Sequence, residues 1–412
     1  MISKELRSIA ALLASTFAMM VGTGLAGMLI PLRAVLEDWS PTAIGWIGTC
    51  YAIAFTAGCL VTPILVKRVG HIRIFAALQT LLGASLLLHA LVVNPITWCL
   101  FRALGGMALA GGYMVVESWL NEKADNANRG KIFSAYMVVS MTGVAAGQYI
   151  VPFGDIGTSV LFMVGTMAFS MSMLPISLST SQAPRPLTRV TINPKRLFQR
   201  SPAAMVGSFL AGVIFGVWNY FGPLYGQALG LSSTGIATML ASGMIGGVVF
   251  QYPIGRLSDM IDRRYVMALA GAVGVAISVG MIIIAPKEPL YIVLGIFALG
   301  SVLFPIYALN IAHANDSAQP EEFVEVSGGL LIVYGIGNMV GPQLGGRLMD
   351  AAGPNGFFIA IGGTYAVYGF YAFWRSLRTQ AVEPSLRSDF QIVPVIPAQT
   401  PETVAMDART SD

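Results

Sequence analysis

Long apolar runs separated by short polar connectors dominate the pattern of hydrophobic and polar positions along the chain. Most of these runs hold about 20 residues or more, the length at which an α-helix spans the hydrocarbon core of a bilayer. Connectors such as residues 93–95 are so short that neighbouring helices must be antiparallel. The pattern predicts an all-α membrane protein with twelve spans, at about 9–32, 42–66, 73–93, 96–120, 131–152, 158–179, 203–229, 234–255, 265–285, 290–313, 325–349 and 356–375.

Composition supports a chain immersed in lipid. Charged residues make up 11% of the 412 residues and hydrophobic residues 55%, whereas an average soluble protein is about 25% charged. Twenty of the 24 Lys and Arg residues fall on one side of the predicted spans, and only Arg33 and Lys287 fall on the other. Because Lys and Arg accumulate on the cytoplasmic side, we expect both termini in the cytoplasm and the protein in the cell (inner) membrane. We expect no nucleic-acid partner.

A basic connector, residues 180–202, divides the chain into an N-terminal half, residues 1–179, and a C-terminal half, residues 203–376. The tail, residues 377–412, has no apolar period, and we expect it to be disordered and cytoplasmic. The halves repeat faintly at an offset of about 192–195 residues: Ala103–Gly105 matches Ala298–Gly300, and the pair Gly143 and Gly147 matches the pair Gly337 and Gly341. Two similar six-helix bundles can rock about a site between them, so this duplication favours a transporter.

Gly255–Arg264 contains a Gly, an Asp four residues later and paired Arg residues, and this pattern resembles the cytoplasmic-loop signature of the major facilitator superfamily. Arg102 with Gly106 resembles its second signature, and the stretch between Val115 and Gly130 looks most like its bacterial YcaD-type branch. The resemblance covers essentially residues 1–380. It implies the fold of that family, two pseudo-symmetric six-helix bundles, and secondary transport.

A further stretch, Gly337–Gly346, resembles the Gly-rich, Pro-bearing signature of the proton-linked exporters in the family. In those exporters the signature lies on span 5. In this chain span 5 has Gln148 instead of the proline, and the signature lies on span 11. The direction of transport therefore stays open.

Arg102 lies well inside predicted span 4, and Glu117 lies in the same span toward its cytoplasmic end. A charge at bilayer depth costs about 2.5–3.5 kcal/mol on insertion scales. With Gly106 and Tyr113, Arg102 and Glu117 form one stripe of span 4, within about 60° of one another. We hypothesise that Arg102 attracts an anion or takes part in proton linkage, and that Glu117 carries a proton. The alternatives are packing or backbone contacts for Arg102, and a structural pair with Arg68 for Glu117.

Loop charges suggest an inner gate, comprising Lys67, Arg68, Arg129, Asp259, Arg263, Glu321 and Glu325. We hypothesise that the basic loop between spans 2 and 3 meets the acidic loop between spans 10 and 11, and that Asp259 faces Arg129. Exposed ion pairs are each worth under about 1 kcal/mol, so they would bias a rocking equilibrium without locking it. The alternative is an ordinary basic cytoplasmic surface with incidental acids.

Aromatic and amide side chains at mid-membrane depth are the candidates for solute binding. They are Trp218, Asn219, Tyr307, Asn310, Tyr334 and Asn338, together with Arg102 and Tyr113, and Pro305 is expected to kink span 10 near two of them. An unpaired amide in hydrocarbon is costly, so these residues bind either a solute or a neighbouring helix.

The sequence therefore predicts a secondary transporter that moves a small organic solute by alternating access, coupled to protons. The alternatives are a gradient-independent facilitator and a non-transporting membrane receptor. The sequence contains no Gly-x4-Gly-Lys-Ser/Thr motif, which argues against direct ATP drive, and no catalytic residues stand out. We expect no enzyme activity, no cofactor and no metal, and a monomer in the lipid bilayer.

Overall fold

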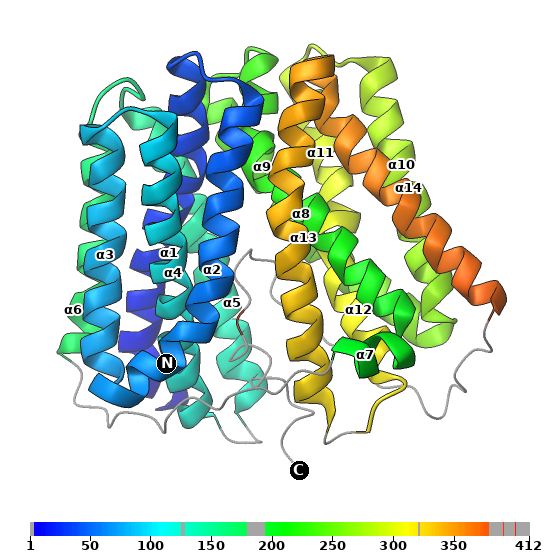
Figure 1. Cartoon of the computed structure of the whole chain (residues 1–412), viewed down its shortest axis with the longest axis horizontal. Coiled ribbons are helices and arrows are strands. Elements are labelled where there is room, and N and C mark those ends of the chain that lie inside the picture. The colour runs from blue at the N-terminus through cyan, green and yellow to red at the C-terminus, as the bar shows by residue number, and fades with distance from the viewer. Residues whose placement is uncertain are drawn as a thin grey trace. The chain divides into compact units, whose positions relative to one another are not determined.

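The computed structural model describes residues 4–124, 128–178, 194–319, 322–378, 390 and 400. These residues are almost entirely helical (Figure 1). The helices are α1 (Lys4–Leu36), α2 (Pro41–Val69), α3 (His71–Leu91), α4 (Pro95–Lys123), α5 (Arg129–Ile150), η1 (Val151–Phe153), α6 (Val160–Ser177), α7 (Pro194–Arg200), α8 (Pro202–Ala228), α9 (Ser233–Met260), α10 (Arg263–Ile284), α11 (Pro289–Leu303), α12 (Pro305–Asn315), α13 (Phe323–Ala352) and α14 (Asn355–Arg378).

The twelve predicted spans are confirmed. Ten spans of the described chain, with α11 and α12 counted together, are long and apolar enough to cross a membrane. Helices α5 and α13 occupy the positions of the fifth and eleventh predicted spans. The tenth span breaks where expected, between α11 and α12, because Pro305 has no N–H and its ring clashes with the preceding turn of a helix.

The central connector differs from the sequence expectation. Residues 194–200 form the short helix α7. The sequence did not predict this helix, because the seven-residue segment has no apolar period. Residues 180–193 of that connector lie outside the described residues, as does the predicted tail, apart from the end of α14 and residues 390 and 400.

Side-chain caps explain where several helices begin. Asn94 precedes α4 and accepts a hydrogen bond from the Ile96 N–H at 2.9 Å. Ser232 caps α9 through the Gly235 N–H, and Asp262 caps α10 through the Arg264 N–H at 2.9 Å. Asn, Ser and Asp satisfy backbone donors that the first turn of a helix leaves without partners. Short connectors can therefore end one span and start the next.

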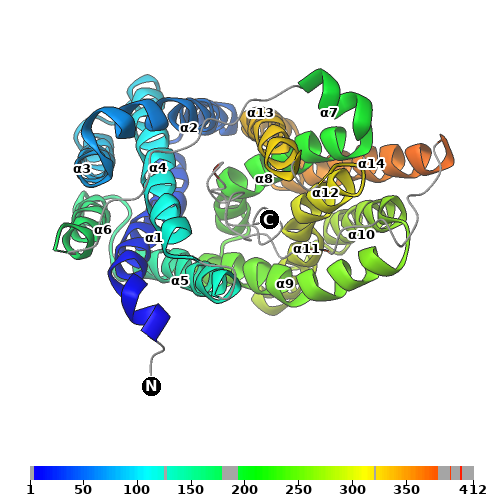
Figure 2. The ribbon, with the colours of Figure 1, turned by 90° about the horizontal axis from the view of Figure 1, so that it is seen from below.

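The chain packs as two compact units. The first comprises Met1–Glu37, Cys50–Val190 and Ile396–Asp412, and the second comprises Asp38–Thr49 and Thr191–Val395. Helices α1, α3, α4, α5 and α6 belong to the first unit, and α8 to α14 belong to the second (Figures 1 and 2). Helix α2 is shared, because its first residues fall in the second unit and the rest in the first.

Glycines give the two units the same internal packing. A β-carbon at Gly147 of α5 would overlap the carbonyl oxygen of Val21 on α1. A β-carbon at Gly341 of α13 would likewise overlap the carbonyl oxygen of Val213 on α8. Both pairs stand at the offset of the internal repeat, so α1 against α5 corresponds to α8 against α13. Small residues let membrane helices approach closely, and this close approach explains the glycine signature on α13.

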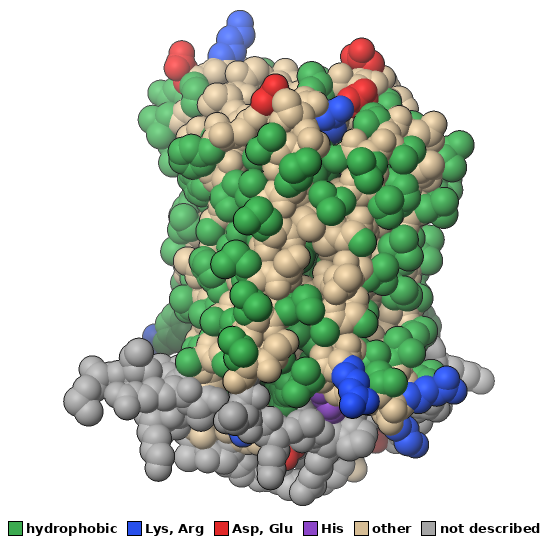
Figure 3. Space-filling view, turned by 90° about the vertical axis from the view of Figure 1, so that its left-hand side faces the viewer, with side chains coloured by type: hydrophobic (Ala, Val, Ile, Leu, Met, Phe, Trp, Pro, Cys, Tyr) green, Lys and Arg blue, Asp and Glu red, His purple; other side chains and the backbone are tan. Residues whose placement is uncertain are grey.

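The outer surface suits a lipid environment. On the face that Figure 3 shows, apolar side chains cover a broad middle band, while Lys, Arg, Asp and Glu gather toward its two ends. Large apolar side chains such as Leu91, Ile283 and Phe370 are more than two-thirds exposed. A soluble protein rarely leaves so many large apolar groups in water.

Candidate functional site

In the first unit, the polar stripe of α4 faces α2. Arg102 lies over the ring of Tyr51, with the guanidinium carbon 4.2 Å from the ring centroid. Such a cation–π contact stabilises a positive charge away from water. One turn further along α4, a β-carbon at Gly106 would approach the backbone carbonyl of Tyr51. Gly106 thus lets the two helices close, and that approach fits the contact made by Arg102.

An aromatic series connects the two ends of this stripe. The ring of Tyr51 lies 6.0 Å from Phe55, and Phe55 lies 6.4 Å from Tyr113. Tyr113 is buried on α4, one turn before Glu117, and its hydroxyl donates to the sulfur of Met20 at 3.1 Å. The structure therefore links Arg102 to Tyr113 through two aromatic rings, and Glu117 follows one turn further along α4.

Glu117 is fully buried in the first unit. The hydroxyl of Tyr136 on α5 donates to its Oε1 at 2.7 Å. The hydroxyl of Thr400 in the C-terminal tail donates to its Oε2. A carboxyl group at this depth needs such donors, because an ionised carboxylate removed from water is costly.

In the second unit, predicted solute-binding residues share one aromatic cluster. The ring of Trp218 on α8 lies 6.1 Å from Phe304, which lies 6.1 Å from Phe215. Phe215 lies 6.0 Å from Tyr334 of α13, and Tyr334 lies 4.7 Å from Tyr307 of α12. Phe304 lies at the break between α11 and α12, and Tyr307 lies in the first turn of α12, so both rings reach this cluster at the break.

Amides border the aromatic cluster. Asn310 of α12 is fully buried, and its Oδ1 accepts a hydrogen bond from the Tyr368 hydroxyl at 3.1 Å. The buried polar atoms without a hydrogen-bond partner among the described residues include three beside this cluster: the Tyr307 hydroxyl, Nδ2 of Asn310 and Oδ1 of Asn338. Buried polar groups are nearly always satisfied in native proteins, so these three are suited to a polar ligand group. Asn219 is half-buried on α8 beside the cluster residue Trp218 in sequence.

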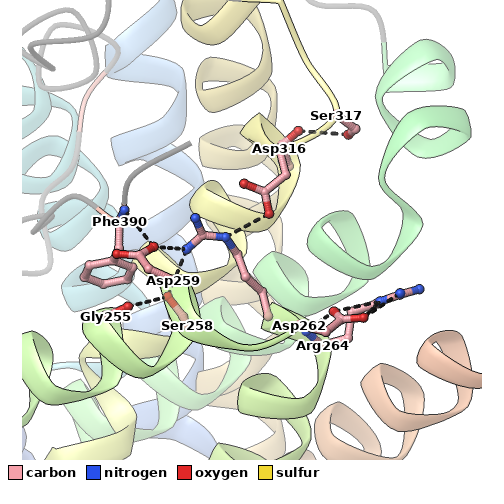
Figure 4. Close-up of polar contacts among 10 residues, drawn as sticks. Gly255, Ser258, Asp259, Asp262, Arg264, Asp316, Ser317 and Phe390 are labelled. Atoms are coloured by element: carbon pink, nitrogen blue, oxygen red, sulfur yellow. Dashed lines mark hydrogen bonds and ion pairs between the residues drawn. The ribbon is translucent and has the colours of Figure 1, made fainter. Parts of the chain in front are cut away.

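Arg263 is the centre of an ion-pair network at the α9–α10 turn. Its side chain is fully buried and contacts Asp259 at 3.0 Å, Asp316 at 2.8 Å and the Ser258 hydroxyl at 2.9 Å. Figure 4 shows Asp259 of α9 and Asp316, just after α12, on either side of this network. The signature with paired Arg residues therefore ties α9 to the end of α12 within the second unit.

The second arginine of the pair joins the same turn to α14. Arg264 pairs with Asp262 at 2.6 Å and donates to the carbonyl oxygen of Arg375 at 3.1 Å. Partial burial raises the pKa of Asp262, but the hydrogen bonds and charge of Arg264 outweigh it and hold that pKa below its ordinary value. Asp262 therefore stays ionised at neutral pH and helps to fix the turn.

The remaining gate candidates lie near the ends of helices. Lys67 and Arg68 are exposed at the end of α2, Arg129 is half-buried at the start of α5, and Glu325 is half-buried in the first turn of α13. Glu321 lies outside the described residues. The pairings of Lys67 and Arg68 with Glu321 and Glu325, and of Asp259 with Arg129, stay predictions.

The sequence interpretation missed several partners. Tyr136, the donor to Glu117, is an aromatic residue near the start of span 5, and its depth could have suggested the pairing. Asp316 lies in the loop between spans 10 and 11, and its carboxylate pairs with Arg263. Glu322, from the same loop, pairs with Arg200 at the end of α7. Two acids of that loop thus have partners inside the second unit.

No group of three or more His, Cys, Asp or Glu residues that could hold a metal ion occurs in the described part of the chain. Cys50, Cys59 and Cys99 are free thiols in α2 and α4. The described residues offer a carboxyl group that can bind a proton at Glu117, and aromatic and amide contacts for a ligand in the second unit.

Comparison with known proteins gives the family of this fold. The model of the Major Facilitator Superfamily matches residues 12–328 and 204–401. The MFS-type transporter YcaD of Escherichia fergusonii is 26% identical over 368 residues, which cover 88% of this chain and 94% of the relative. YcaD of Shigella flexneri is equally similar, 26% identical over 368 residues with the same shares covered.

Solved structures share the fold at low sequence identity. The nucleoside transporter NupG superposes with a TM-score of 0.74 at 14% identity, covering 89% of this chain and 98% of NupG. A bacterial homologue of the human lysosomal transporter Spinster, in an inward-facing and occupied conformation, superposes with a TM-score of 0.72 at 15% identity. That match covers 94% of this chain and 99% of the Spinster homologue.

Proposed function

The chain belongs to the major facilitator superfamily and is a membrane transport protein, and from that premise we propose that it is a proton-coupled secondary transporter of a small organic solute. Alternating access of the two six-helix halves would carry the solute. We further propose that it acts as a monomer in the inner membrane with both termini in the cytoplasm, as the distribution of Lys and Arg indicates.

The observation that supports proton coupling is the buried carboxyl group of Glu117. It lies within the spanning helix α4, is fully buried, and accepts a hydrogen bond from Tyr136 at 2.7 Å. Ionisable groups at membrane depth are rare and typical of proton pathways. A carboxyl group can bind one proton and release it, so Glu117 is suited to carry a proton through each transport cycle.

The second unit supports a solute that is neutral or mildly amphipathic. Rings of Trp218, Tyr307 and Tyr334 provide apolar contact area, and the buried polar atoms of Asn310 and Asn338 provide hydrogen bonds. Ligand sites commonly combine a mostly apolar lining with a few polar groups that fix orientation. In the first unit, Arg102 over the ring of Tyr51 offers a positive charge that would suit an anionic solute instead.

We propose that the exposed Lys67 and Arg68 and the acids of the loop between α12 and α13, Glu321 and Glu325, form an inner gate. Asp259 and Arg129 would form a second gate contact. Arg263 would support that contact, because its pairs with Asp259 and Asp316 hold the α9–α10 turn in place. Weak pairs of this kind can bias an equilibrium between two states.

Proton binding can be tested before the solute is known. Proteoliposomes adsorbed on a solid-supported membrane give a transient current when a pH jump protonates the carrier. We expect this current in the unmodified protein and its loss in Glu117→Gln, which keeps the size of the side chain. The matched control is Glu122→Gln on the same helix, because Glu122 is exposed. Equal currents in Glu117→Gln and the unmodified protein would overturn the role of Glu117.

The solute can be sought in the same preparation. Thermal unfolding of the purified protein, measured with nucleosides, sugars, amino acids and aromatic alcohols, identifies compounds that raise the unfolding temperature. We expect the stabilising compounds to be neutral or mildly amphipathic and their effect to be lost in Asn310→Ala. Stabilisation that persists in that variant would place the solute elsewhere.

A further inference from the structure

Two thiols meet between α2 and α4 in the first unit. The side chains of Cys50 and Cys99 are in hydrogen-bond contact, and both residues belong to that unit. Both carry free thiols and are partly exposed. Cys59 lies nine positions beyond Cys50 on α2, which is about 13 Å along a helix axis. The contact therefore singles out one pair among the three cysteines of the chain.

The register of α2 against α4 supports this contact independently. A β-carbon at Gly58 of α2 would lie 2.6 Å from the backbone oxygen of Met107 on α4. A β-carbon at Gly111 of α4 would lie 2.8 Å from the hydroxyl oxygen of Thr62 on α2. The residues of each pair are 49 positions apart in the sequence, and so are the two cysteines. The two helices thus run side by side in the same direction, and the cysteine pair keeps their register.

The cysteine pair lies beside the contact between Arg102 and Tyr51. Cys99 precedes Arg102 by three positions, so the two side chains share a face of α4. Cys50 directly precedes Tyr51, whose ring centroid is 4.2 Å from the guanidinium carbon of Arg102. A covalent bond between the two sulfurs would hold α2 against α4 at this cation–π contact.

The pair is near the membrane side on which an oxidant is available. In the orientation proposed above, the start of α4 faces the outer compartment, opposite the ends rich in Lys and Arg. Cys99 is four residues after Pro95, the first residue of α4, which is about 6 Å along a helix axis. Disulfides form and persist in oxidising compartments such as the bacterial periplasm.

We propose that Cys50 and Cys99 form a reversible disulfide that fastens α2 to α4 when the outer compartment is oxidising. The oxidant is a small disulfide of the glutathione type. The thiolate of one cysteine attacks it, expels one thiol and leaves a mixed disulfide, and the second cysteine attacks this bond and expels the second thiol. Two protons and two electrons pass from the cysteines to the oxidant. This inference goes beyond the proposed function and does not depend on proton coupling.

The disulfide stabilises the first unit. It closes a loop of about 50 residues, and such a cross-link removes conformational freedom from the unfolded chain. We therefore expect oxidation to raise the unfolding temperature by several degrees, and reduction to reverse the rise.

Formation of the disulfide is tested with the full chain in proteoliposomes. The protein is reduced, incubated with glutathione disulfide and unfolded in detergent, and its free thiols are counted with a polyethylene-glycol maleimide. We expect three labels before oxidation and one afterwards, because the chain has three cysteines. Cys50→Ser and Cys99→Ser should each keep two labels. The matched control, Cys59→Ser, should fall from two labels to none.

Intact mass distinguishes the bridge from glutathione adducts, since the bridged chain loses two hydrogen atoms and gains nothing. Thermal unfolding of the oxidised and reduced protein then measures the stabilisation. Cys59→Ser should respond to oxidation as the unmodified protein does, whereas Cys99→Ser should not respond.

Two outcomes would overturn the inference. Three labels after oxidation, or glutathione adducts in place of the bridge, would refute the disulfide itself. A bridge that leaves the unfolding temperature unchanged or lowers it would refute the fastening of α2 to α4. Neither outcome bears on the proton carried by Glu117, which the pH-jump currents test separately.

Discussion

Replacing Arg263 with glutamine removes the guanidinium group that joins α9 to the end of α12. In the structure this group is fully buried and contacts Asp259 at 3.0 Å and Asp316 at 2.8 Å. The side chain of Asp316 is only 3% exposed, so water cannot replace the lost cation. Glutamine keeps part of the volume and can keep one hydrogen bond, but it cannot neutralise either carboxylate.

The expected cost is large. Removing one partner of a buried ion pair costs about 3–5 kcal/mol, because the other charge stays buried without compensation. For a folded unit of about 200 residues, 1 kcal/mol corresponds to roughly 2–4 °C in the unfolding temperature. We therefore expect Arg263→Gln to lower the apparent unfolding temperature of the second unit by about 10 °C.

Intrinsic tryptophan fluorescence during a thermal ramp in detergent measures this change, and Trp218 reports on the second unit. Adding Asp316→Asn to Arg263→Gln removes the uncompensated carboxylate and should recover a large part of the loss. The control is Arg256→Gln, since Arg256 is exposed and a surface substitution usually changes stability by less than about 0.5 kcal/mol. An unfolding temperature for Arg263→Gln within about 2 °C of that of the unmodified protein would refute the buried network.

Three further predictions concern packing, pH and the gate. Gly337→Ala would place a β-carbon against the backbone of Phe209, so it should lower the unfolding temperature markedly, whereas Gly280→Ala, with open space around it, should not. Asp262→Asn should destabilise at neutral pH. The folded-state pKa of Asp262 is lowered, so the stability that its carboxylate contributes is fully present above the ordinary Asp pKa of about 3.9. That contribution is lost as pH falls through the lower folded-state pKa. The unfolding temperatures of the unmodified protein and of Asp262→Asn should therefore converge in acid. Lys67→Glu should impair solute uptake and Glu325→Lys should restore it; a double variant as inactive as Lys67→Glu would exclude that gate contact.

Much of the fold follows from local physics that a sequence displays. An apolar run of membrane-spanning length has few alternatives to a helix, since every backbone polar group must be satisfied inside the segment. The break at Pro305 follows in the same way from the missing N–H of proline. The stripe from Arg102 to Glu117 could be predicted because residues on one helix face have fixed spacing.

The partners of those residues depend on how helices pack, which no local rule gives. Tyr136 reaches Glu117 only because α5 lies beside α4 at the right rotation. Asp316 pairs with Arg263 because the end of α12 approaches the α9–α10 turn. Thr400 is 283 residues from Glu117 in sequence, and nothing in the composition of the C-terminal tail indicated their hydrogen bond. Side-chain type identified candidates for the site, and tertiary packing decided their partners.

The central claim is that solute movement is coupled to a proton carried by Glu117. Its most direct test is uptake of an identified solute into proteoliposomes, with the membrane voltage clamped and a pH gradient of one unit imposed. One proton per neutral solute predicts about tenfold accumulation, since one pH unit is worth about 1.36 kcal/mol. The unmodified protein and Glu122→Gln should accumulate the solute against its gradient, while Glu117→Gln should only equilibrate it. Accumulation by Glu117→Gln equal to that of the unmodified protein, or uptake by the unmodified protein that ignores the pH gradient, would contradict the account.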